Sequence, residues 1–215
     1  MDKLTFTAAA LCSLTALFTL SPVRAGTLED GLTEIQHDWE VIRYQTPAAE
    51  REKRYEALVT KAHRLSESQP GRSEPLIWEG IVVSSLAGEK GGLGALSLVK
   101  QAKSLYEEAI RIDGTALDGS AYNSLGVLYY KVPGWPVGFG DKDKARELLQ
   151  RALALNPKGI DPNFFYGEYL LETKQAAEAI SYLERAMQAP ARPGRQIADA
   201  GRREEARHLI EKAKR

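Results

Sequence analysis

The sequence predicts an all-α fold, a right-handed solenoid of stacked helical hairpins. Two observations predict it. Beyond residue 26, apolar side chains recur at three- and four-residue steps, as on one face of a helix, and strand-like alternation is absent. In addition, small and apolar residues recur 34 positions apart, in the pairs Ala145 and Ala179, Leu149 and Leu183, and Ala152 and Ala186. Such a fixed period predicts a helical unit that is stacked on a copy of itself.

A period of 34 residues is that of the tetratricopeptide (TPR) repeat, in which helix A packs against helix B. Each of three predicted hairpins within residues 73–191 has a glycine at the small position of helix A, namely Gly80, Gly126 and Gly167. Small residues are required there because the two helices approach closely. We therefore predict three TPR-like repeats and expect each of these glycines to face a neighbouring helix.

The repeats are flanked by predicted helical caps. Residues 26–72 contain two amphipathic stretches, Thr27–Tyr44 and Ala48–Ser68, which lack the small residues of the repeat. We interpret this pair as a degenerate repeat or cap, because the terminal units of solenoids are commonly atypical. Residues 192–215 contain a charged amphipathic helix, Asp199–Lys214, which we expect to cover the open end of the stack.

Two repeats carry extra residues between helix A and helix B, so we predict enlarged A–B loops at about 87–97 and 131–141. The second insert, KVPGWPVGFGD, combines glycines and prolines that form turns with two aromatic residues, Trp135 and Phe139. Rigid aromatic side chains offer a large contact area to a ligand or partner. The alternative is that they fold back onto neighbouring helices and anchor the insert.

Helix A lines the concave face of a TPR solenoid, and the spacing of the repeat selects the residues that lie there. The candidate ligand- or partner-binding residues are Ile81, Asn123, Val127, Tyr130, Lys131, Phe164 and Glu168, together with Trp135 and Phe139 of the insert; Ile77, Ser84 and Leu171 are expected on the same face. They form an apolar and aromatic groove with a few polar groups, which suits a pocket or a peptide channel. In the alternative interpretation, several of them pack against the inserts.

No catalytic site, cofactor or metal site is predicted. The 29 basic and 29 acidic side chains balance, which disfavours nucleic acid as the partner. The glycine-rich stretch 91–94 lacks the Lys-Ser/Thr of a phosphate loop. Asp141 and Asp143 begin like a calcium loop, but Ala145 occupies the third ligand position. Asp141 and Asp161 are instead expected to cap helices. An enzyme is the least favoured alternative to a non-catalytic binding protein.

Residues 1–25 predict a secretory signal peptide. An apolar run, Leu4–Leu20, is followed by Val23-Arg24-Ala25. This tripeptide places small residues at positions −3 and −1 of a cleavage site before Gly26. A retained membrane anchor is the alternative. The one cysteine, Cys12, lies inside this run behind Leu11, where lipid attachment would need a small residue. We therefore expect a periplasmic protein that has no disulfide and no stable membrane anchor after signal cleavage.

Three segments together resemble a known family: GGLGALSLVKQAKSLYEEAIRID, YNSLGVLYYKVPGWPVGFGDKDKARELLQRALALNP and GIDPNFFYGEYLLE. They are similar to the T-component family of the TPR-associated TRAP transporters, over about residues 75–201, and the insert is the most specific part. The resemblance implies an accessory protein that partners a periplasmic solute-binding protein, which delivers an organic acid or apolar ligand to a transporter. It also implies a homo-oligomer as one form.

The sequence departs from this family in one respect, because members are often lipoproteins and no lipid-attachment cysteine is present here. This departure keeps a second interpretation open. In that interpretation the protein is a general protein–protein scaffold in assembly of the cell envelope, and its concave face binds a peptide or a helix.

Overall fold

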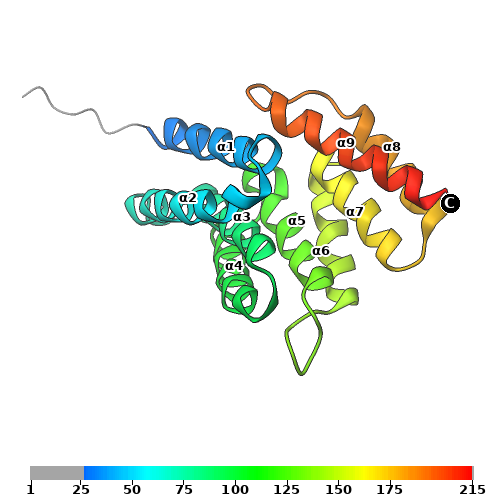
Figure 1. Ribbon diagram of the computed structural model, residues 1–215, viewed down its shortest axis with the longest axis horizontal. Helices are drawn as coiled ribbons and strands as arrows, with labels where there is room; N and C mark the ends of the chain where they lie inside the picture. The colour runs from blue at the N-terminus through cyan, green and yellow to red at the C-terminus, as the bar shows by residue number, and fades with distance from the viewer. Residues whose placement is uncertain (1–26, 215) are drawn as a thin grey trace, which may run out of the picture.

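The computed structural model describes residues 27–214, with the side chain of Leu93 excepted. The signal peptide predicted at 1–25, with Cys12, lies outside the described residues. The described chain forms helices α1 (Leu28–Gln45), α2 (Ala48–Ser68), α3 (Ser73–Lys90), α4 (Gly92–Asp113), α5 (Ala116–Lys131), α6 (Lys142–Leu155), α7 (Ile160–Glu172), α8 (Ala176–Gln188) and α9 (Gln196–Ala213) (Figure 1). It contains no strand within 27–214, so the all-α prediction is confirmed.

The three predicted repeats are the hairpins α3–α4, α5–α6 and α7–α8, whose paired helices pack against each other along their length. The glycine prediction is confirmed in all three. A Cβ atom added to Gly126 would lie 2.8 Å from Cγ of Leu149, and one added to Gly167 would lie 2.8 Å from Cγ of Leu183. One added to Gly80 would lie 2.5 Å from the ring of Tyr106. The absence of a side chain on helix A therefore allows helix B to seat its large residue.

We expect Gly167→Ala to lower the free energy of unfolding by about 2 kcal/mol, because the new methyl group would overpack the α7–α8 contact. Gly88→Ala in α3 is the matched control, since a Cβ there would meet no atom within 4 Å. This control should gain about 0.5–1 kcal/mol from helix propensity. Urea denaturation of both variants measures the difference, and equal stabilities would contradict the proposed close approach.

The first insert differs from the expectation. Its residues do not form an enlarged loop over 87–97 but lengthen the two helices, so that α3 ends at Lys90 and α4 begins at Gly92. The chain reverses at Gly91 and Gly92, which have φ angles of 60° and 54°. Residues with a Cβ atom rarely adopt such angles, so two adjacent glycines replace a longer loop.

The second insert does form a loop, which joins α5 to α6 and projects from one end of the molecule (Figure 1). Asp141 caps α6 as predicted, because its side chain accepts hydrogen bonds from the backbone N–H groups of Asp143 and Lys144. Asp161 does not cap α7. Gly159 occupies the N-cap position of α7. Asp161 lies in the first turn of the helix, and its carboxylate accepts hydrogen bonds from Arg192 and Arg202.

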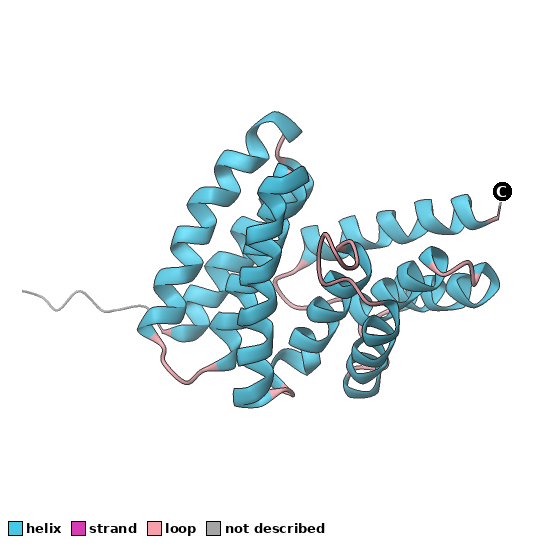
Figure 2. Cartoon of the chain, turned by 90° about the horizontal axis from the view of Figure 1, so that it is seen from below, coloured by secondary structure: helices cyan, strands magenta, loops and turns pink. Residues whose placement is uncertain are grey.

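Figure 2 shows that the described chain consists of helices joined by loops and turns, and the contacts between alternate helices close into a ring. Contacts run from α1 to α3, α3 to α5, α5 to α7 and α7 to α9, and α9 in turn contacts α1. The last helix therefore does more than cover the open end of the stack, because it joins the first helix. Among the helices that the structure describes, none is long and apolar enough to cross a membrane.

Candidate functional site

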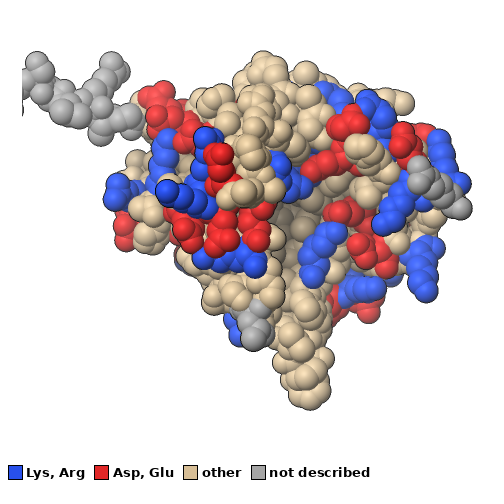
Figure 3. Space-filling model, viewed as in Figure 1, with Lys and Arg blue, Asp and Glu red and all other residues tan. Residues whose placement is uncertain are grey.

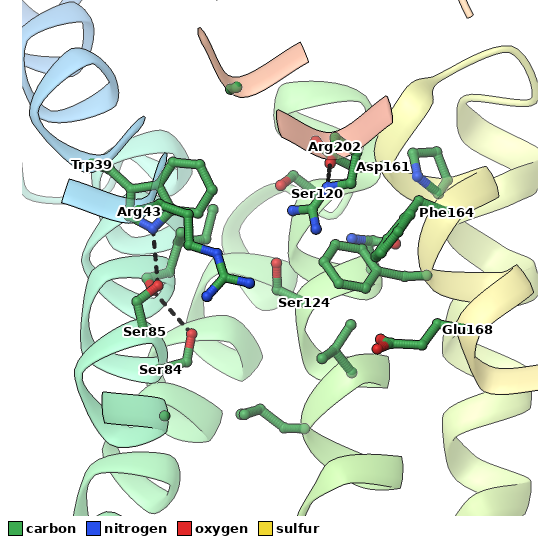
Figure 4. A pocket seen from close by; sticks show the side chains of 18 of the residues that line it. Trp39, Arg43, Ser84, Ser85, Ser120, Ser124, Asp161, Phe164, Glu168 and Arg202 are labelled. Atoms are coloured by element: carbon green, nitrogen blue, oxygen red, sulfur yellow. Dashed lines mark hydrogen bonds and ion pairs between the residues drawn. The ribbon is translucent and has the colours of Figure 1, made fainter. Parts of the chain in front are cut away.

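The ring encloses a cavity of about 1450 Å³, to which α1, α3, α5, α7 and α9 all contribute side chains (Figure 4). A cavity of this size holds a ligand larger than most metabolites or a stretch of peptide. Its wall is largely apolar, and the bulky residues that form it are Trp39, Trp78, Ile81, Val127, Phe164 and Phe165.

The α1–α3 side of the cavity is a fixed aromatic wall. The rings of Trp39 and Trp78 meet edge to face at 6.1 Å, and the indole N–H of Trp39 donates to Oγ of Ser85 at 2.9 Å. The indole donor of Trp39 is thereby satisfied within the protein, and its ring is held against that of Trp78. The hydroxyl of Ser84, hydrogen-bonded to Tyr106 at 3.1 Å, adds a small polar group beside it.

The α7–α9 side holds a network of ion pairs. Nε of Arg202 donates to Asp161 at 3.0 Å, and its Nη1 donates to Glu205 at 2.6 Å. Arg192 reaches the other oxygen of Asp161 at 2.6 Å. Burial opposes ionisation of Asp161, but the guanidinium groups of Arg202 and Arg192 outweigh it and lower the pKa of this carboxyl to about 2. Asp161 is therefore a fixed negative charge at any physiological pH.

Arg202 also forms part of the apolar wall. Its guanidinium carbon lies 4.5 Å from the ring centroids of both Phe164 and Phe165, so the cation is sandwiched between carboxylates and aromatic faces. Figure 4 shows this group above Phe164 on the side of the cavity opposite Arg43. Stacking of this kind favours Arg over Lys.

Two further arginines bring hydrogen-bond donors to the cavity. Arg43 extends from α1 into the cavity (Figure 4); one Nη pairs with Glu205 at 2.8 Å, while 40% of its side chain is exposed. Arg195 lies over the ring of Trp78 at 5.0 Å, and its buried Nε finds no hydrogen-bond partner within the described chain. The buried Oδ1 of Asn123 is equally unsatisfied. The Nε of Arg195 lies 3.6 Å from Oε2 of Glu40, too far for a hydrogen bond. Unsatisfied buried groups are costly, so a group that bonded to either atom would relieve that cost.

Across the cavity from Arg43, the carboxylate of Glu168 in α7 accepts hydrogen bonds from two residues of α5 (Figure 4). The hydroxyl of Tyr130 donates to it at 2.6 Å and Nζ of Lys131 at 2.8 Å. Burial and the neighbouring carboxylate raise the pKa of Tyr130 well above its usual range, so its hydroxyl stays protonated and donates. These bonds tie α5 to α7 and fix Glu168 at the cavity wall.

The structure brings most of the predicted site residues together. Those that line the cavity are Ile81, Asn123, Val127, Lys131, Phe164 and Glu168, with Ser84. Tyr130 stands behind Glu168, with its ring against that of Tyr169 at 5.8 Å, and is not part of the lining. Ile77 is buried with Ala109 and Ala121 in the core, away from the cavity.

The two aromatic residues of the second insert do not line the cavity. Phe139 packs edge to face on Tyr129 at 5.5 Å, with Nζ of Lys103 at 5.8 Å from its ring, so it anchors the loop as the alternative interpretation expected. Trp135 does neither, because 90% of it is exposed at the tip of the loop. A binding role for Trp135 stays a prediction.

Sequence reasoning missed Trp78 of the first repeat and the residues that the two flanks contribute, which are Trp39, Arg43, Arg192, Arg195, Arg202 and Glu205. The flanks were interpreted as caps, and caps do not line a concave face. One signal was present in the sequence, namely Gly201 inside an otherwise strongly charged helix. A glycine there indicates a close helix–helix contact rather than an exposed cap.

No group of three or more His, Cys, Asp or Glu residues within 27–214 is arranged to hold a metal ion. Of the carboxylates that line the cavity, Asp161 and Glu205 are paired with arginines, and Glu168 is hydrogen-bonded to α5. The cavity thus combines largely apolar walls with arginine side chains at one side and the carboxylate of Glu168 at the other.

Comparison with known proteins gives a family match for part of the chain. The profile of the tetratricopeptide repeat family matches residues 137–196, which extend from the second insert to the start of α9. No curated protein matches the sequence. The profile match and the three helical hairpins together support a TPR protein, whose repeats form a protein-interaction fold.

Several solved structures are similar over most of the chain. MamA from AMB-1 shares 18% identity, covering 86% of this chain and 94% of that chain with a TM-score of 0.47. TTC0263, a thermophilic TPR protein of Thermus thermophilus, shares 16% identity, covering 85% of this chain and 100% of that chain with a TM-score of 0.43.

Proposed function

We propose that this protein is a non-catalytic receptor whose central cavity binds an organic acid with an apolar body. The observation that carries the proposal is the closed ring around an aromatic-walled cavity of about 1450 Å³. The walls formed by Trp39 and Phe164 would bury the apolar body of the ligand. Its carboxylate would accept hydrogen bonds from Arg43 and Arg195, whose donors are not all used within the protein.

We further propose that the receptor acts in the periplasm as an accessory of TRAP-type transport, and that its partner is a solute-binding protein. The resemblance of the KVPGWPVGFGD insert to the T-component family supports this, as does the TPR fold, which builds interaction surfaces. Co-purification tests the partner. Recovery of a solute-binding protein supports the transport role, whereas recovery of envelope-assembly factors alone would replace it with a scaffold role.

Ligand binding can be measured by tryptophan emission. The variant Trp135→Phe removes the exposed tryptophan and leaves Trp39 and Trp78, both of which line the cavity. We expect an aliphatic carboxylate to change the emission of this variant and to bind about tenfold more tightly than the alcohol of the same chain length, because a charge-assisted hydrogen bond contributes on the order of 1.5–3 kcal/mol. Arg43→Met should remove this preference for the carboxylate.

The matched control is Arg207→Met, which removes an exposed arginine from α9 outside the cavity lining. It should leave both affinities unchanged. An emission that no carboxylate or alcohol alters would overturn the proposed receptor, and an equal preference in Arg43→Met and the unsubstituted protein would overturn the role of Arg43.

A further inference from the structure

The loop between α5 and α6 displays an exposed apolar tip. Trp135 is 90% exposed and Val137 is 57% exposed, which sets them apart from the other large apolar side chains of the described residues. The nine residues 132–140 carry no charge. Figure 1 shows the loop projecting beyond the helices, and Figure 3 shows its tip free of charged side chains. Two exposed apolar side chains on an uncharged, projecting loop make this tip a candidate interaction surface.

The loop is held in one conformation rather than left loose. Phe139 packs against Tyr129, and the backbone N–H of Asp141 donates to the carbonyl of Tyr129 at 2.8 Å. Across the base of the loop, the N–H of Gly140 donates to the carbonyl of Pro133 at 2.9 Å. The tip is therefore ordered before it binds anything, which lowers the entropic cost of binding.

Several backbone N–H groups of the loop are hydrogen-bonded within the loop itself. The N–H groups of Val137 and Gly138 both donate to the carbonyl of Gly134, at 3.2 and 3.1 Å. Pro133 and Pro136 have no N–H group at all. An unsatisfied backbone donor is strongly disfavoured in an apolar medium. Most backbone N–H groups of this loop are either hydrogen-bonded or replaced by proline, so the loop could enter an apolar medium at low cost. A loop that stays in water has no such constraint, because water satisfies its donors.

We propose that this tip inserts into the surface of a lipid bilayer, with Trp135 at the boundary between headgroups and acyl chains. Tryptophan favours this boundary because its ring is apolar and its N–H group reaches water. A convex tip fits a deformable lipid surface directly, whereas a protein partner would need a matching pocket. The flanking charges are balanced, since Lys131 pairs with Glu168 and Lys144 with Glu147.

This contact is weak and reversible, and it does not depend on anionic lipid, because one short apolar tip buries little area and no basic patch surrounds it. It also has a consequence for the cavity. Pro133 and Val137 belong to the loop and also line the cavity, so insertion of the tip would place the cavity mouth beside the lipid. The inference stands independently of the receptor function, since it rests on the loop alone.

The test uses the emission of Trp135 in the intact protein, mixed with vesicles of phosphatidylcholine that carry brominated acyl chains. Bromine quenches only nearby tryptophans, and Trp39 and Trp78 are buried. We expect quenching that disappears in Trp135→Phe. Val137→Asp places a charge on the tip and should raise the lipid concentration for half-maximal quenching about tenfold. Replacing part of the lipid with phosphatidylglycerol should leave that concentration unchanged.

Leu117→Asp is the matched control, because it makes the same change of charge at a large apolar residue that is exposed in another part of the described chain, where Asp tolerates the positive φ of 49°. Its tryptophan emission should be quenched at the same lipid concentration as that of the unsubstituted protein. Absence of quenching, or equal quenching in Val137→Asp, would overturn the proposal. A shift of Trp135 emission that requires an added partner protein and not lipid would also overturn it, and would assign the tip to a protein interface.

Discussion

Asp161→Asn is expected to lower the free energy of unfolding by about 3 kcal/mol, a large fraction of the stability of a domain of this size. The substitution keeps the shape of the side chain and removes its charge. Arg202 and Arg192 would then share one carboxylate fewer in a partly buried site. Loss of one partner from such a network is costly because it leaves a desolvated charge without full compensation. Denaturation in urea measures the change.

The control for this prediction is Asp143→Asn, which removes an exposed carboxylate from the first turn of α6. Its effect should stay within about 0.5 kcal/mol, as for most surface substitutions. A loss in Asp161→Asn no larger than that of the control would show that the arginines compensate one another through Glu205 and Asp199, and that Asp161 is dispensable.

The same carboxylate gives the protein an acid dependence of known sign. The pKa of Asp161 is lowered to about 2 in the folded state, from an ordinary value of 3.8. A group whose pKa is depressed by folding stabilises the fold above its unfolded pKa, and this stabilisation is lost as the pH falls through the folded pKa. Stability should therefore drop between about pH 4 and pH 2, by about 2 kcal/mol from this group. Asp161→Asn should flatten that part of the profile.

The features that the sequence predicted correctly are contacts and caps within a single helical hairpin. The positions of Gly126 and Gly167 follow from a repeat of 34 residues, and each lies against the leucine that the repeat places on helix B. The cap of α6 by Asp141 follows from its place directly before the first residue of the helix. Such features depend on neighbours within one hairpin, and one hairpin is encoded by about 34 consecutive residues.

Helix lengths were predicted less well. The repeat pattern shows that residues are inserted, but it does not show whether they form a loop or extend the two helices. The residues of 87–97 are mostly good helix formers apart from their glycines, so extending α3 and α4 was as compatible with the pattern as a loop. The positive φ angles of Gly91 and Gly92 decided the outcome, since they allow the chain to reverse without a loop.

The part of the cavity that the two flanks form could not be predicted, for a physical reason. A solenoid is held together by contacts between neighbouring repeats, and its sequence pattern records only those contacts. Glu40 and Ala198 are 158 positions apart and meet only because the curvature of the intervening helices brings the two ends together. No spacing rule within the repeats fixes that curvature, so the arginines of α9 could not be assigned to the site.

The contact between the first and last helix is therefore the feature on which the proposed receptor function depends. Glu40 of α1 is 2% exposed and accepts a hydrogen bond from the backbone N–H of Ala198, in the first turn of α9, at 3.0 Å. Its carboxylate also lies 3.6 Å from Nε of Arg195. A negative side chain at the start of a helix satisfies a free donor and interacts favourably with the helix dipole. One turn further along, the ring of Tyr44 lies where a side chain on Gly201 would have to be.

We expect Gly201→Leu to open this contact and to lower the affinity for a carboxylate ligand at least roughly tenfold, since the ligand would lose the donors of Arg195 and part of the apolar wall. Opening is measured by the distance between spin labels on α1 and α9, at Thr33→Cys and Glu204→Cys, both exposed positions. The natural sequence contains one cysteine, Cys12, so a serine there leaves only the introduced labels. The distance should lengthen and its distribution broaden.

Ala200→Leu is the matched control, because it adds the same bulk to an exposed position of the same helix. It should preserve both the label distance and the affinity. The unfolding transition of Gly201→Leu should remain cooperative and lose only about 2 kcal/mol, since contacts between neighbouring hairpins persist when the ends separate. Binding would thus fall while the fold survives. An unchanged affinity in a protein whose label distance has increased would show that an open solenoid binds as well as the ring, and that closure serves stability alone.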